Sequence, residues 1–234
     1  MIKGVQLHPD MKDQDIINLK KGQKIMTDML RQFDKICRKH NIRYIIFAGT
    51  LLGSHFYKGW VPWDGDIDVL VYAKDYDKLK KALIEELPSD YWFQDPLNDK
   101  HYKEPYGIAK IRYLYAYYEN CEMYGWHGGL QLDIFGFGFN NKNEFITTTS
   151  DHNEVFMKEK MSKEDVFPLK EIKFEDIQVT TLSNYKKYLN IRYPGCKKLI
   201  PIENRFPHEG KIIFGISDFH KNKYPELYLE DKLK

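Results

Sequence analysis

The sequence predicts an α+β domain in which helices flank a mixed β-sheet. Residues 22–40 indicate an amphipathic helix, because apolar side chains recur there at three- and four-residue spacing. Short apolar runs at 44–47 and 67–72 have the composition of buried strands, and longer β-like runs follow at 108–118 and 130–139. Helices and strands in this order are typical of an α+β or α/β domain with a mixed sheet.

The remaining segments follow from local signals. In order, we expect a helical turn at 51–54, a loop at 59–65 that contains Pro62, a Lys-rich helix at 75–87, a turn at 140–143 and a helix at 182–193 that ends at Pro194-Gly195. The sequence contains no repeats or low-complexity linkers. We therefore expect one domain over 1–234, with a core at about 22–195 and an irregular C-terminal extension at 196–234.

Composition excludes several classes of protein. The formal net charge of +2 is too balanced for a general nucleic-acid binder, so we expect no nucleic acid as partner. The three Cys show no CxxC spacing, which suits a reducing compartment. No apolar run is long enough for a membrane span, and the start of the chain lacks the apolar stretch of a signal peptide. We expect a cytoplasmic protein, with peripheral association with a membrane left open.

Three aspartates form the most informative pattern. Asp66 and Asp68 are two residues apart at the mouth of a strand, so their side chains project from the same face. Asp133 lies inside an apolar run, where a lone carboxylate is costly unless it is paired, hydrogen-bonded or metal-bound. A hard divalent cation takes oxygen ligands and would resolve both problems. We predict that Asp66, Asp68 and Asp133 are the catalytic residues and hold Mg²⁺ or Mn²⁺.

Small and basic residues nearby predict contacts with phosphate. Gly49 and Thr50 lie between the strand at 44–47 and the helix that follows it. Small residues there would let backbone N–H groups and the dipole of that helix meet phosphate oxygens. Lys110 and Arg112 alternate on one strand and would together face a diphosphate, with a solvated sheet face as the alternative. A Gly-Thr pair, an Asp-x-Asp strand and a distant strand Asp form the pattern of a nucleotidyltransferase fold.

The same residues carry a resemblance to a known family. The run from Phe47 to Gly53 (FAGTLLG), followed by the run from Lys58 to Val69 (KGWVPWDGDIDV), resembles the signature of the LicD family, which includes fukutin and fukutin-related proteins. The match is specific over 43–78, moderate over 105–137, where IAKIR and LDIF occur, and weak at 177–195. The chain departs from the family at His55-Phe56-Tyr57, where an Arg is common, and at Gly65, where an Asp is common.

The resemblance implies a function. It implies transfer of a phosphorylated alcohol, similar to phosphocholine or phosphoribitol, from a CDP-linked donor to a hydroxyl of a glycan or glycolipid, with release of CMP. It also implies that Asp66, Asp68 and Asp133 are metal ligands, and that Lys110 and Arg112 face phosphate or the acceptor. Two alternatives stay open: transfer of the nucleotide itself to a small molecule or protein, and a non-catalytic protein that binds a nucleotide or glycan.

Four features have more than one interpretation at this point. Three roles are open for Asp64: a further metal ligand, a helix cap, or a residue that supports the metal ligands. His127 is a candidate base, with a structural role favoured, and Lys58 is favoured as a surface lysine. The run at 204–209 mixes charged, aromatic and proline residues on an expected loop, which makes it a candidate for recognising the acceptor.

Overall fold

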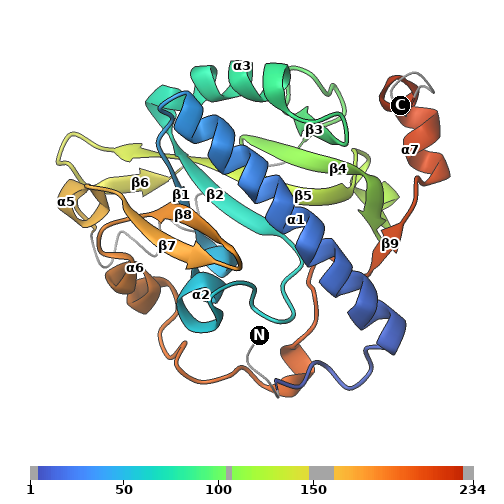
Figure 1. Cartoon of the computed structure of the whole chain (residues 1–234), viewed down its shortest axis with the longest axis horizontal. Coiled ribbons are helices and arrows are strands. Elements are labelled where there is room, and N and C mark those ends of the chain that lie inside the picture. Colours follow the sequence, from blue (N-terminus) through green and yellow to red (C-terminus); the bar gives the residue numbers. More distant parts are fainter. Residues whose placement is uncertain (1–4, 104–106, 148–160, 229–234) are drawn as a thin grey trace.

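The computed structural model describes residues 5–103, 107–147 and 161–228 (Figure 1). Two predictions fall partly outside the described residues. They are the absence of a signal peptide, which involves residues 1–4, and the second region of family resemblance, which includes residues 105–106. Within the described residues the helices are α1 (Asp13–Lys39), α2 (Ala48–Tyr57), α3 (Tyr76–Glu86), α5 (Lys163–Val166), α6 (Tyr185–Arg192) and α7 (Asp218–Lys223). The strands are β1 (Tyr44–Ile46), β2 (Ile67–Tyr72), β3 (Tyr91–Gln94), β4 (Ala109–Tyr118), β5 (Gly129–Phe139), β6 (Phe145–Thr147), β7 (Lys170–Phe174), β8 (Ile177–Thr181) and β9 (Ile212–Phe214).

A seven-stranded mixed sheet forms the centre of the molecule. Its main path has the order β1-β2-β5-β4-β3, while β6 pairs with β5 and β9 pairs with β4. Strands β2 and β5 are parallel, whereas the other neighbouring strands of this sheet are antiparallel. A separate hairpin, β7-β8, lies beside β1 and α2 (Figure 1). The predicted α+β class, with a mixed sheet flanked by helices, is confirmed.

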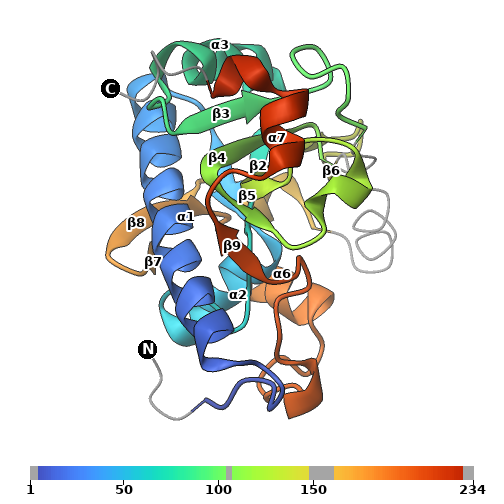
Figure 2. The ribbon, with the colours of Figure 1, turned by 90° about the vertical axis from the view of Figure 1, so that its right-hand side faces the viewer.

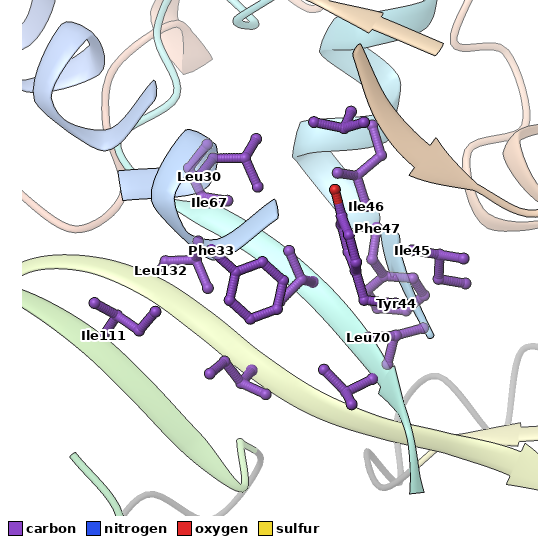
Figure 3. Close-up of a cluster of buried hydrophobic side chains, with 14 of the residues drawn as sticks. Leu30, Phe33, Tyr44, Ile45, Ile46, Phe47, Ile67, Leu70, Ile111 and Leu132 are labelled. Atoms are coloured by element: carbon purple, nitrogen blue, oxygen red, sulfur yellow. The ribbon is translucent and has the colours of Figure 1, made fainter. Parts of the chain in front are cut away.

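Helix α1 covers one face of this sheet. Asp13 and Asp15 in its first turn and Arg38 and Lys39 in its last turn complement the helix dipole. Its buried stripe packs against the sheet, and Figure 3 shows part of this core. The fully buried side chains there include Leu30 and Phe33 of α1, Ile67 of β2, Ile111 of β4 and Leu132 of β5.

The packing of α1 determines which face of the sheet carries polar groups. Ile67 of β2 and Leu132 of β5 are partners in register and belong to the core under α1. Successive side chains of a strand point to opposite faces. Asp68 and Asp133, which directly follow these two residues, therefore face away from α1.

The C-terminal segment returns to the central sheet, which differs from the irregular extension that we expected. Figure 2 shows it running from α6 past the N-terminal end of α1 to β9 and α7. Strand β9 pairs antiparallel with β4, with Phe214 opposite Ala116, and Ile212 is buried. Strand β9, which lies after residue 195, thus belongs to the same sheet as the strands that carry Asp68 and Asp133.

Element ends also differ from the sequence-based expectation in places. Helix α1 begins at Asp13, nine residues before the predicted start, and helix α6 is shorter than the predicted 182–193. Strands β3, β7 and β8 were not predicted. Among the described residues, no helix combines the length and the apolar character that crossing a bilayer requires.

Candidate active site

Three aspartates meet where β2 and β5 run side by side. Asp68 and Asp133 are partners in the parallel register of these strands. Asp66 precedes Asp68 by two residues, so its side chain projects toward the same face. One carboxylate oxygen from each of the three lies within 4.8 Å of the others. The structure therefore brings together the acids that the sequence predicts to act as one group.

Burial makes the ionised form of these acids costly. It raises the pKa of Asp66 well above the ordinary value, and the charges of Glu209 and then Asp68 raise it further. Burial likewise raises the pKa of Asp68, with the charge of Asp133 as the next contribution. Asp133 has a counter-charge, because Lys110 Nζ lies 2.7 Å from its Oδ1 and both side chains are buried. One lysine leaves the cluster with excess negative charge.

This set of donors fits a divalent cation. Within the described ranges, neither Asp66 nor Asp68 has a lysine or arginine at ion-pair distance, and His208 Nε2 is 4.0 Å from Asp66 Oδ2. Three carboxylates are the oxygen ligands that Mg²⁺ and Mn²⁺ favour, and a cation would relieve the repulsion that raises the pKa of the acids. The assignment of Asp66, Asp68 and Asp133 as metal ligands and catalytic residues remains a prediction.

Asp64 belongs to a second group of ligand-bearing side chains. It lies with His208 and Glu209 of the C-terminal segment, and one ligand atom from each lies within 4.8 Å of the others. Burial, and then the charge of Glu209, raises the pKa of Asp64 to about 7. The sequence leaves Asp64 open between several roles and marks 204–209 only as a loop for the acceptor. The mixed charge of that loop is the one signal in the sequence that points to a role for it. Its contact with Asp64 joins segments that are far apart in the chain, so no local pattern could reveal it.

The N-terminus of α2 adjoins the acids, as the Gly49-Thr50 pair predicts. A Cβ added to Gly49 would lie 2.5 Å from Asp64 Oδ2, so any larger residue at this position would displace the Asp64 carboxylate. The Thr50 hydroxyl accepts a hydrogen bond of 2.9 Å from the backbone N–H of Asp68. Thr50 is itself buried, so it fixes the start of β2 next to the acids. Contact of either residue with donor phosphate remains a prediction.

Lys110 and Arg112 lie on the same face of β4, as predicted, but both are buried. Lys110 contacts Asp133. Arg112 is 2% exposed and donates to Gln94 Oε1, Gly129 O and Gln131 Oε1 at 2.6–2.9 Å. Gln131 Nε2 in turn donates to Asp133 Oδ2 over 3.3 Å. These contacts give Arg112 a positioning role next to Asp133, and contact of Lys110 or Arg112 with phosphate remains a prediction.

Hydrogen bonds from distant elements fix the loop that carries Asp64 and Asp66. Gln23 of α1 donates to the carbonyl of Asp64 over 2.9 Å. Tyr118 of β4 donates its hydroxyl proton to the carbonyl of Gly65 over 2.6 Å. The loop is thus tied to both α1 and β4.

His127 and Lys58 do not join the acids. His127 is fully buried, stacks on His220 with ring centroids 4.2 Å apart, and lies 2.6 Å from Tyr228 Oη through Nε2. Burial, and then the charge of His220, lowers its pKa well below the ordinary value. Lys58 is exposed, and its Nζ donates to the carbonyl of His55. These contacts support the structural role favoured for His127 and the surface position favoured for Lys58.

The fold and the site together define a class of protein: α+β domains in which aspartates from neighbouring strands converge at one site. The family described as "LicD/FKTN/FKRP, nucleotidyltransferase domain" matches residues 41–181, which is more than half of the chain. The chain belongs to this family. The predicted resemblance and the nucleotidyltransferase-like fold are thereby confirmed, and membership is consistent with a transferase.

Individual relatives cover different parts of the chain. The lipopolysaccharide cholinephosphotransferase LicD of Haemophilus influenzae is 31% identical over 86 residues, which is 37% of this chain and 28% of that protein. The uncharacterized proteins RP689 of Rickettsia prowazekii and RT0683 of Rickettsia typhi are each 27% identical, over 88% and 86% of this chain and 69% and 56% of their own lengths. Among solved structures, the lincosamide antibiotic adenylyltransferase LnuA matches with a TM-score of 0.38 and 13% identity. The match covers 77% of this chain and 90% of the LnuA chain.

Proposed function

We propose that this protein is a metal-dependent transferase that moves a phosphorylated alcohol, of the phosphocholine type, from a CDP-linked donor to a hydroxyl of a glycan or glycolipid and releases CMP. One observation carries the proposal: Asp66, Asp68 and Asp133 converge on one face of the parallel β2–β5 pair. A relative that is named a lipopolysaccharide cholinephosphotransferase supports the choice of head group and acceptor class.

The three aspartates would hold Mg²⁺ or Mn²⁺. A cation bound there supplies charge neutralisation for the diphosphate of the donor and for the leaving CMP. Catalysis of phosphoryl transfer is mainly positioning and electrostatic stabilisation, so rigid placement of these carboxylates is the main requirement. Lys110 orients Asp133, and Thr50 fixes the backbone of Asp68.

The remaining residues would bind and align the substrates. The Ala48 N–H at the start of α2 donates to Tyr188 Oη over 3.2 Å. The positive end of the α2 dipole still favours negatively charged groups, which supports a place for donor phosphate near Gly49. Trp63 lies beside the acids in the chain, and Arg205 lies over its ring at 5.7 Å from the centroid. An aromatic ring with a cation beside it is suited to packing against a sugar ring, so we assign this pair to the acceptor.

The test is release of CMP from CDP-choline and related CDP-alcohols in the presence of Mg²⁺ or Mn²⁺ and a glycan acceptor. We expect Asp66→Asn to lower turnover by about 10²-fold or more, on the scale of losing one preorganised electrostatic contact. The exposed Asp10→Asn serves as the matched control and should keep full turnover. Full metal-dependent turnover in Asp66→Asn would refute the assignment.

Product analysis separates this function from the alternative with the same fold. Transfer of a phosphorylated alcohol releases CMP, whereas transfer of a nucleotide from a nucleoside triphosphate releases pyrophosphate. Detection of pyrophosphate, without CMP from any CDP-alcohol, would replace the proposed reaction with nucleotidyl transfer.

A further inference from the structure

We propose that Asp64, His208 and Glu209 form a second divalent-cation site, adjoining the three aspartates, in which the C-terminal segment supplies two of the three ligands. The inference rests on the proposed function, since it adds an ion to the same active site. It concerns residues that the roles of Asp66, Asp68 and Asp133 leave unused.

The three side chains come from distant parts of the chain and meet at one point. Asp64 lies on the loop before β2, whereas His208 and Glu209 lie between α6 and β9. One ligand atom from each lies within 4.8 Å of the others. The His208 side chain is 74% exposed, which leaves the group accessible from solvent. Two carboxylates and one imidazole form a mixed donor set that suits Mn²⁺ or Zn²⁺.

Glu209 provides an independent observation that points to a ligand. Its side chain is only 6% exposed, and its Oε2 has no hydrogen-bond partner among the described residues. An unpaired buried carboxylate oxygen costs free energy unless something in the native protein compensates it. The absence of a side chain at position 65 provides the space, because a Cβ on Gly65 would lie 2.4 Å from Glu209 Oε2. The sequence therefore admits this carboxylate to the site and leaves its Oε2 without a hydrogen-bond donor among the described residues.

The proposed site shares a border with the three aspartates. His208 Nε2 lies 4.0 Å from Asp66 Oδ2, and the charge of Glu209 is the first of the neighbouring charges that raise the pKa of Asp66. Two cations about 3.5–4 Å apart can stabilise both the attacking and the leaving oxygen of a displacement at phosphorus. The second cation would thus share the diphosphate with the first.

His208 offers a competing explanation for Glu209. Its Nε2 lies 2.5 Å from Glu209 Oε1, so a protonated imidazole would compensate part of the carboxylate charge without any metal. The two explanations differ in the number of ions that the protein binds, which can be counted without any assay of activity.

The experiment counts Mn²⁺ by isothermal titration calorimetry and records electron paramagnetic resonance spectra of the full chain. We expect wild type to bind two Mn²⁺ with the broadened spectrum of a coupled pair, and Glu209→Gln to bind one with a six-line spectrum. Exposed Glu203→Gln, on the same segment, is the matched control and should bind two. His208→Ala alters an exposed side chain and should weaken the second ion by at least about tenfold.

The outcomes separate this inference from the proposed function. One Mn²⁺ in wild type, lost in Asp68→Asn and unchanged in Glu209→Gln and His208→Ala, would overturn the second site and leave the first intact. Loss of one ion in Glu209→Gln, with Mn²⁺ binding unaffected by Asp68→Asn, would support the second site and overturn the proposed centre of three aspartates. Wild type that binds no Mn²⁺ would overturn both.

Discussion

Lys110 and Asp133 form a buried ion pair at the centre of the acid cluster. Their charged atoms are 2.7 Å apart, and the two side chains are 5% and 9% exposed. Removal of one partner of such a pair leaves an uncompensated buried charge, which is far more costly than the pair is stabilising. The Lys110 side chain therefore affects the stability of the folded protein through Asp133, and this effect is separate from any contact with phosphate.

We predict that Lys110→Met destabilises the metal-free protein by about 3–5 kcal/mol, on the scale of breaking a buried ion pair. Methionine keeps most of the apolar stem and removes the charge. Unfolding by urea in the presence of a chelator measures the change, and exposed Lys100→Met is the control. A loss below about 0.5 kcal/mol, which is typical of a surface substitution, would show that Asp133 does not depend on this lysine.

The sequence predicts single residues best where the geometry of one strand determines their direction. Asp66 and Asp68 are two apart on a strand, and Asp133 interrupts an apolar strand, so their convergence follows from local pattern. The same pattern correctly predicts that Lys110 and Arg112 share a face. It does not show what covers that face, and Arg112 proves to be buried among oxygen acceptors.

At the scale of elements, α2 and the acid-bearing loop pack together without space between them. A Cβ on Gly53 would lie 2.3 Å from the carbonyl oxygen of Gly59 and 2.7 Å from the backbone nitrogen of Val61. Both contacts are to backbone, so neither can be relieved by rotating a side chain. The loop is also fixed by Trp60, whose Nε1 donates to Thr27 of α1 over 2.9 Å.

We predict that Gly53→Ala destabilises the protein by about 1–3 kcal/mol, the usual cost of forcing a methyl group into a packed interior. Turnover should also fall, since the displaced loop carries Asp64 and Asp66. Gly138→Ala in β5 is the control, because a Cβ there meets nothing within 4 Å. Equal thermal stability and turnover in the two variants would contradict the proposed dependence of the site on this packing.

The sequence predicts the elements that have strong local periodicity, but it does not predict the short β7-β8 hairpin or strands such as β9 that depend on a distant partner. Strand β2 has the predicted bounds of 67–72, because its apolar run ends at clear loop signals. Strand β9 has only three residues, Ile212–Phe214, and exists because β4 offers it an edge. A strand of this kind has no periodicity that a sequence pattern could reveal.

At the scale of the whole molecule, a chain of hydrogen bonds joins the acids to the C-terminal helix region. Gln94 accepts from Arg112 and donates to Asp99 Oδ2 over 2.7 Å, and Tyr224 Oη donates to the same oxygen over 3.0 Å. Together with Gln131, this chain reaches Asp133. The segment after 195, which composition alone describes as irregular, is therefore connected to the acids through this chain, and Glu209 of the same segment lies beside Asp64.

The most direct measurement of the central claim is thermal unfolding of the full chain with CDP, CMP, UDP, ADP or GDP, each with Mg²⁺ or with a chelator. Ligand that binds only the folded state at a hundredfold excess over Kd stabilises it by about 2.7 kcal/mol. We expect CDP with Mg²⁺ to raise Tm most, and we expect the increase to vanish with chelator or in Asp68→Asn. An equal or larger increase with ADP or UDP, an increase that persists in chelator, or no increase with any nucleotide would contradict a CDP-linked donor held through the three aspartates.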